Sequence, residues 1–178
     1  RCSSKLKGAL KMILETERLI LKPYENEFAD EIFEVVKHKE IADTMVMIPH
    51  PYPREVVDSW ISYLQKSFEQ GKAYEFAVFL KENDRYIGNC GLVKFSKNHK
   101  NAEVGYFIKV SEWGKGYATE ACKKIIEYGF QKHQLNRIYS RCMVRNTASR
   151  KVMEKSGMIW EGRHRQEFLK DGVYEDMD

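Results

Sequence analysis

The sequence predicts one mixed α/β domain, with a central, mostly antiparallel mixed sheet of six to seven strands and about four helices on its two faces. Three observations support this prediction. The chain has 178 residues, about the length of one domain. It is 43% hydrophobic with only 11 Gly and 4 Pro, which supplies a core and excludes a disordered or linker-dominated chain. Segments of alternating apolar residues also interleave with segments of helical periodicity.

The basic charge of the chain is concentrated at its start. The sequence holds 30 Lys and Arg against 26 Asp and Glu, a formal net charge of +4. Four of the bases, Arg1, Lys5, Lys7 and Lys11, lie in residues 1–11, which contain no acid, so residues 12–178 are formally neutral. A nucleic-acid-binding fold carries a basic stripe over its body, so we expect no nucleic-acid partner. We interpret residues 1–11 as a leader or a cloning remnant, with a native basic arm as the alternative, and residues 12–178 as the domain.

Targeting and metal-binding signals are missing from the sequence. It has no apolar run of about 18 residues and no apolar stretch typical of a secretory signal, so we expect a cytoplasmic protein without a membrane partner. Cys2, Cys90, Cys122 and Cys142 are widely spaced, and the five histidines are scattered. Because no ligand spacing recurs, we predict free thiols and no metal site.

The first elements are a strand and a helix. Met12–Pro23 alternates like a strand, with Leu19 and Leu21 on one face, and Pro23 ends it. Asn26 is a suitable N-cap, and apolar residues at helical spacing then predict a helix over Asn26–Val36.

A proline-rich loop precedes the second helix. Three of the four prolines fall within IPHPYPRE, which forbids regular structure there. The loop Ala42–Arg54 is therefore either a wall of a substrate site or a plain connector. Apolar residues from Val56 to Phe68 mark one face of a helix that Gly71 ends.

The middle of the sequence predicts a three-stranded antiparallel meander followed by a long helix. The strands, separated by turn-rich segments, are Tyr74–Leu80, Tyr86–Phe95 and Ala102–Val110. Helical periodicity then runs from Ala118 to Gly129, and this is the clearest helix in the sequence.

The remainder alternates strands and a helix. Arg137–Val144 is predicted as a strand, Asn146–Lys155 as a helix capped by Asn146 and stopped by Gly157, and Met158–Arg163 as a strand. The final segment, QEFLK-DG-VYED, predicts a hairpin with an Asp-Gly turn.

Two glycines stand immediately before the long helix, in Trp113-Gly114-Lys115-Gly116-Tyr117-Ala118. Glycines here let successive N–H groups converge on one point, where the helix dipole adds about half a positive charge, a geometry that binds phosphate. The alternative is an ordinary tight strand-to-helix turn. The spacing fits neither a Walker A loop nor a dinucleotide fingerprint.

This loop resembles the pyrophosphate loop of the GNAT N-acetyltransferase superfamily, [Arg/Gln]-x-x-Gly-x-[Gly/Ala]. Gly116 and Ala118 match it, whereas Trp113 replaces the usual Arg or Gln, which affects only a side-chain contribution. The phrases AEVGYFIKVSEWGKGYATEA and VRNTASRKVMEKSGMIWEG are similar to the ribosomal-protein N-acetyltransferase (RimJ/RimL-like) branch. The likeness runs from about Met12 to the C-terminus.

The resemblance implies a site for acetyl-CoA, without a metal. The strands Ala102–Val110 and Arg137–Val144 would splay apart to admit the pantetheine arm, and the Ile108 N–H would polarise the thioester carbonyl. Asn146 would contact the arm, and Ser149 would protonate the departing thiolate. The implied cofactor-binding residues are Phe107, Ile108, Trp113, Gly114, Lys115, Gly116, Tyr117, Ala118, Thr119, Asn146 and Ser149.

Glu103 is the predicted catalytic base. It stands at the family's strand carboxylate, and alternation places it on the same face as Gly105 and Phe107. The alternative is a solvated strand glutamate. Tyr106 and Tyr117 are alternative candidates for the general acid. For each of them the other interpretation is packing or contact with the cofactor. Cys122 and Cys142 are interpreted as structural, since direct transfer needs no nucleophilic thiol.

The expected function is direct transfer of acetyl to a primary amine, most simply a protein N-terminus as in ribosomal-protein-alanine acetyltransferases. Deprotonating a free α-amine at pH 7 costs about 1 to 1.4 kcal/mol, against about 4.6 kcal/mol for lysine. One modest carboxylate therefore suits the α-amine better. A small-molecule or antibiotic acetyltransferase and a non-catalytic acyl-CoA sensor remain as alternatives, and the chain would be a monomer or homodimer.

Overall fold

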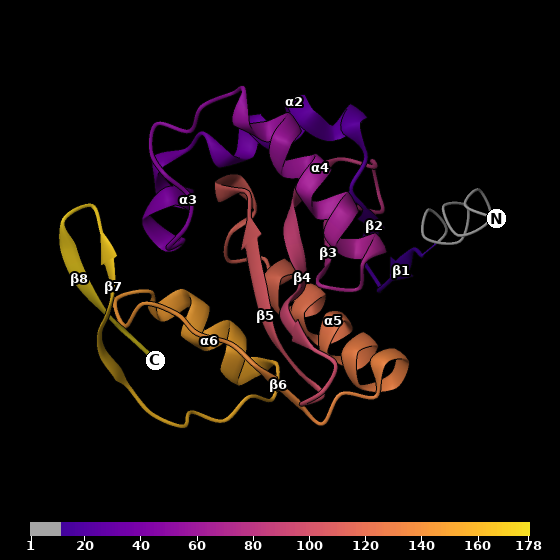
Figure 1. Cartoon of the computed structure of the whole chain (residues 1–178). Helices are drawn as coiled ribbons and strands as arrows, with labels where there is room; N and C mark the ends of the chain where they lie inside the picture. The colour runs from indigo at the N-terminus through magenta and orange to yellow at the C-terminus, as the bar shows by residue number, and fades with distance from the viewer. Residues whose placement is uncertain (1–11) are drawn as a thin grey trace.

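A six-stranded mixed sheet runs through the molecule, and a separate two-stranded sheet lies beside it (Figure 1). The computed structural model describes residues 12–178, so the expectation for residues 1–11 lies outside the described residues. The large sheet has the order β1-β2-β3-β4-β5-β6, comprising β1 (Leu14–Glu15), β2 (Leu19–Pro23), β3 (Tyr74–Leu80), β4 (Tyr86–Ser96), β5 (Asn101–Ile108) and β6 (Arg137–Tyr139). The small sheet pairs β7 (His164–Lys170) with β8 (Val173–Met177).

Helices cover both faces of the large sheet, which confirms the predicted fold class. The α-helices are α2 (Ala29–Val36), α3 (Lys39–Thr44), α4 (Val56–Glu69), α5 (Tyr117–His133) and α6 (Thr147–Lys155), and the 3-10 turns are η1 (Asn26–Phe28) and η2 (Val110–Glu112). One core lies between the sheet and α5, and the other lies between the sheet and helices α2 and α4. Neighbouring β5 residues divide between them, since Val104 faces α5 and Phe107 faces α4.

The N-terminal prediction needs three corrections. Met12–Pro23 is a two-strand hairpin of β1 and β2, because the chain turns back after Glu15. Asn26 is not an N-cap, because its side-chain oxygen accepts a hydrogen bond from Gln65 Nε2 instead. The start of the predicted Ala42–Arg54 loop is also helical, because buried Ile41 and Ala42 fix α3 against its neighbours.

The predicted strand Arg137–Val144 is shorter than expected. Pairing between β5 and β6 is parallel and stops at Glu103–Tyr139. Ser140 Oγ then donates to the Val104 carbonyl at 2.8 Å, where a backbone donor would continue the ladder. Cys142 and Val144 bond instead to Asp178 and Asp176 at the end of the hairpin. The two strands therefore separate after three residue pairs, as the resemblance implied.

The predicted strand Met158–Arg163 is wrong. This segment forms no ladder with any described strand, and Ile159 and Trp160 are exposed. A cavity lies between the segment and β6, so the alternating pattern finds no backbone partner. The Asp-Gly hairpin is confirmed, but it forms its own sheet as β7 and β8.

The structure confirms the predicted glycines at two helix ends and the free cysteines among the described residues. Gly71 and Gly157 follow α4 and α6 with φ of +64° and +88°. Cys90, Cys122 and Cys142 are free and buried, whereas Cys2 lies outside the described residues. No helix within residues 12–178 is long and apolar enough to span a membrane.

Candidate active site

The glycine loop forms the start of α5. Gly114 and Gly116 have φ of +77° and +85°, in the left-handed region that favours glycine. Gly116 is the N-cap of α5, and no side chain hydrogen-bonds to the first turn as a cap. The N–H groups of that turn therefore point outward as donors at the positive end of a 17-residue helix. This arrangement suits an anionic ligand such as a diphosphate.

Ion pairs of Glu112 hold the glycine loop in place. The Glu112 side chain is 4% exposed and accepts from Arg85 Nη2 at 2.7 Å and Lys115 Nζ at 2.8 Å. The hydrogen bond from Lys115 is the main reason that the pKa of Glu112 lies below its ordinary value. Ion pairs within the protein thus hold the loop in this shape.

Arg18 adds a cation that the sequence analysis missed. Its Nη1 donates to the Lys115 carbonyl at 3.1 Å, and its guanidinium pairs with Glu120 at 2.7 Å and lies over the Tyr117 ring. No local pattern could reveal this contact, because Arg18, just before β2, and Lys115, just before α5, meet only in the folded chain.

Beyond the last residue pair with β6, the outer edge of strand β5 has backbone N–H and C=O groups that no described strand pairs with. These groups point into the gap between the two strands. Lys109 N–H donates to the Ile87 carbonyl, so Gly88 and Ile108 form a non-hydrogen-bonded pair of the ladder. The polar backbone groups of Ile108 therefore point away from β4, and by alternation so do those of Tyr106. The Ile108 carbonyl already accepts from Trp113 Nε1 at 2.6 Å, whereas its N–H faces the gap.

The sequence-predicted residues Asn146 and Ser149 meet this edge at the start of α6. Asn146 Oδ1 accepts from Ser149 N–H at 3.1 Å, which confirms the predicted cap. Tyr106 Oη lies 2.9 Å from Ser149 Oγ. Burial raises the pKa of Tyr106 far above its ordinary value, so its hydroxyl stays neutral and can hydrogen-bond to Ser149. Burial also raises the pKa of the nearby Cys142 thiol.

Glu103 lies on the opposite face of β5 from Tyr106, in the last residue pair with β6. Its side chain is 13% exposed, and its Oε2 atom contacts Lys94 Nζ at 2.8 Å and Arg141 Nη2 at 3.2 Å. Arg141 also pairs with Glu167 of β7. The carboxylate is thus held among cations, and its role as a base stays a prediction.

The predicted wall Ala42–Arg54 contacts two parts of the C-terminal half. The Thr44 carbonyl accepts from Asn146 Nδ2 at 3.4 Å, and the Ile48 carbonyl accepts from buried Lys170 at 3.0 Å. The wall therefore lies between the α6 start and the hairpin, a position in which it can border an acceptor site (Figure 1).

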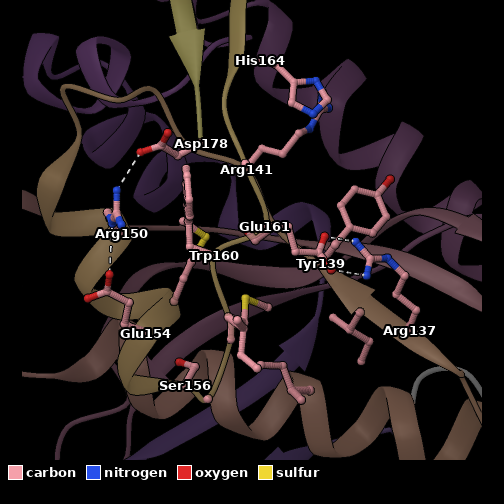
Figure 2. A pocket seen from close by; sticks show the side chains of 18 of the residues that line it. Arg137, Tyr139, Arg141, Arg150, Glu154, Ser156, Trp160, Glu161, His164 and Asp178 are labelled. Carbon is pink, nitrogen blue, oxygen red and sulfur yellow. Dashed lines mark hydrogen bonds and ion pairs between the residues drawn. The ribbon is translucent and has the colours of Figure 1, made fainter.

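A cavity of about 740 Å³ lies elsewhere, between β6, α6 and the segment after Gly157 (Figure 2). Its floor is apolar, from Ile126, Phe130, Ile138, Met153 and Met158. Ion pairs of Arg137 with Glu161 and of Arg150 with Asp178 border it (Figure 2). No residue of the glycine loop and neither Asn146 nor Ser149 lines it, so this cavity is separate from the candidate active site.

Comparison with known proteins agrees with this geometry. Residues 18–159 match the family described as the acetyltransferase (GNAT) domain. An uncharacterized N-acetyltransferase p20 of Bacillus licheniformis is 34% identical over 149 residues, covering 84% of this chain and 83% of the relative. The ribosomal-protein-serine acetyltransferase of Escherichia coli is 32% identical over 111 residues, or 62% of this chain and 60% of the relative. A solved RimL ribosomal L7/L12 alpha-N-protein acetyltransferase in complex with coenzyme A shares the fold with a TM-score of 0.86 and 17% identity, covering 93% and 94%.

Proposed function

The chain belongs to the GNAT acetyltransferase domain family and is an acetyl-transferring enzyme, and we propose that it moves acetyl from acetyl-CoA directly to the α-amine of a protein N-terminus. One observation carries the choice of donor. The uncapped glycine turn at α5 opens beside the unpaired backbone edge of β5, so one ligand can place a diphosphate at the first and an extended amide arm along the second.

Backbone and hydroxyl groups supply the chemistry in this proposal. The Ile108 N–H donates to the thioester oxygen as negative charge develops there. Ser149 Oγ, aligned by Tyr106 Oη, protonates the thiolate as it leaves. A carboxylate on the other face of β5 accepts the proton of the amine, and the sequence nominates Glu103 for this role.

A protein N-terminus is the acceptor that the observations favour. The names of two relatives state action on a ribosomal protein, and one of them specifies the α-amino group. The Lys170–Ile48 hydrogen bond joins the predicted wall to the hairpin, and in this proposal these two segments recognise the first residues of a peptide.

The test is thiol release from acetyl-CoA in the presence of short peptides that begin with Ser or Ala. The same peptides with acetylated N-termini are the matched control, and they should release no thiol. Turnover with small amines alone would overturn the protein acceptor. Coenzyme A binding without turnover on any amine would instead identify a non-catalytic sensor.

A further inference from the structure

We propose that Glu75, near the start of strand β3, accepts the proton of the acceptor amine. This inference rests on the proposed acetyl transfer and names a residue for its proton-accepting step. Glu75 shares a sheet face with Glu103, but its surroundings are different.

The first support is the row of residues that crosses the sheet at Glu75. Glu75 pairs with Gly91 of β4, and Gly91 pairs with Gly105 of β5. A Cβ on Gly91 would meet the backbone of Tyr74 and Glu75 first and Glu75 Cγ at 2.8 Å, so β3 and the base of the Glu75 side chain lie close over this glycine. A Cβ on Gly105 would meet nothing within 4 Å. Neither glycine places a side chain between the Glu75 carboxylate and β5, and the space over Gly105 is open. This face of the sheet is the one opposite Tyr106.

The second support is a chain of hydrogen bonds that fixes the carboxylate. Glu75 Oε2 accepts from Asn89 Nδ2 at 3.0 Å, and Asn89 Oδ1 accepts from Tyr24 Oη at 2.8 Å. Asn89 and Tyr24 are buried, and Tyr24 packs edge-on against Trp60. The amide is therefore oriented with its NH₂ group toward Glu75. Within residues 12–178 no hydrogen bond engages Glu75 Oε1, which is the atom available to an amine.

The third support is the lack of a cation. No ion pair of the described residues includes Glu75, whereas Glu103 contacts Lys94 and Arg141. The titratable groups near Glu75 are Tyr24 and Tyr86 on its own face of the sheet and Cys90 on the opposite face, and burial keeps all three neutral by raising their pKa values. Burial also raises the pKa of Glu75 to about 7. A base is most effective with a pKa near the working pH, close to the value of about 7.7 to 8 for an α-amine.

The reaction then balances. Glu75 takes one proton from the ammonium form of the acceptor, and the freed nitrogen lone pair forms the N–C bond. The C–S bond breaks with its electron pair on sulfur, and Ser149 Oγ donates a proton to the thiolate. The nitrogen carries one excess proton after the N–C bond forms; it releases this proton to solvent, and solvent returns one to Ser149. Glu75 returns its proton to solvent after the amide leaves.

The test is Glu75→Gln, which keeps the side-chain volume and an oxygen for Asn89. We expect kcat to fall on the order of 100-fold or more, while the Kd for coenzyme A stays within about twofold of wild type. Because the carboxylate is charged only above its pKa, wild-type kcat should fall as pH drops through about 7. This inflection should be absent from Glu75→Gln, a change that a structural role alone would not produce.

The comparison variant is Glu103→Gln. Wild-type kcat and an unchanged pH profile in Glu75→Gln would overturn the assignment, as would loss of the inflection in Glu103→Gln alone. Should Glu75→Gln not fold, a carbon-13 titration of the Glu75 carboxylate in the wild-type protein decides, and an ordinary glutamate pKa would refute the proposal. An inactive wild type that binds coenzyme A would refute the proposed function itself, a separate result.

Discussion

Helices α5 and α6 both begin beside strand β5, but only α6 has a described side chain that accepts a hydrogen bond from an N–H group of its first turn. At α6 the Asn146 side chain accepts from Ser149 N–H. At α5 the N-cap is Gly116, with φ of +85° and no capping side chain. At α6 a side chain therefore satisfies one N–H group of the first turn, whereas at α5 no described side chain does and the donors point outward.

This difference separates positioning from binding. The cap at α6 holds Ser149 against Tyr106, so contacts within the protein position the proposed proton donor. The start of α5 has its loop fixed by Glu112 and Arg18 but its donors free. Changes at α5 should therefore mainly affect coenzyme affinity, and changes at α6 should mainly affect turnover or stability.

The largest effect is expected from Gly116→Val. A β-branched residue disfavours the left-handed conformation, and its side chain would cover the N–H groups of α5. We expect coenzyme A affinity, measured by calorimetry, to fall on the order of 100-fold or more, which corresponds to about 2.7 kcal/mol.

Gly157→Val is the matched control for backbone strain. Gly157 has φ of +88°, and a Cβ there would meet nothing within 4 Å. It follows the C-terminus of α6, so stability should fall as in Gly116→Val while coenzyme affinity remains. Equal losses of affinity in both variants would show that strain, rather than blocked donors, weakens binding.

The next effect concerns turnover through Ser149→Ala. The Asn146 cap uses the backbone N–H of this residue and survives the change, so folding should be nearly unaffected. Without the hydroxyl the thiolate leaves without a positioned proton, and kcat should fall by about 10- to 100-fold at unchanged coenzyme affinity. Tyr106→Phe, which only removes the partner of Ser149, should have a smaller effect. A larger loss in Tyr106→Phe would make tyrosine the donor.

Much of the fold was predictable because its signals are local. The strand-like runs of β3 and β4 bounded by turn-rich segments, the Asp-Gly hairpin and the Asn146 cap depend on neighbouring residues, and the structure confirms them. The resemblance to acetyltransferases, including the ribosomal-protein branch, is also confirmed by the relatives. The assigned roles of Glu103 and Ser149 remain predictions.

The incorrect or missing features depend on distant partners. Residues 158–163 have a strand pattern, but a strand also needs a neighbouring edge, and the cavity separates them from β6. Arg18 meets Lys115 across 97 positions, and Arg85 meets Glu112 across 27. The proposed base Glu75 could not be predicted from the sequence for the same reason, because its surroundings depend on Gly91 and Asn89 of the neighbouring strand.

A moderate effect on stability is expected from Asn146→Ala. Loss of the cap should lower the free energy of unfolding by about 1 kcal/mol, measured by urea denaturation. Asn146→Asp keeps an oxygen acceptor and should retain the stability of the wild type. If Asn146→Asp nevertheless weakens coenzyme binding, Asn146 contacts the ligand as well as capping the helix. If Asn146→Ala leaves the free energy of unfolding unchanged, the Asn146 side chain does not stabilise the start of α6, and the contrast with α5 is wrong.

The smallest effect is expected at Trp113, where the family has Arg or Gln. Its indole N–H donates to the Ile108 carbonyl, so it joins the glycine loop to the edge of β5. Trp113→Phe keeps an aromatic ring but removes this bond, which contributes about 0.5 to 1.5 kcal/mol to stability. Coenzyme affinity should weaken only about threefold, because the backbone donors of α5 remain. Trp160→Phe, beside the separate cavity, should leave affinity unchanged, and an equal loss there would show that the indole of Trp113 does not position the loop.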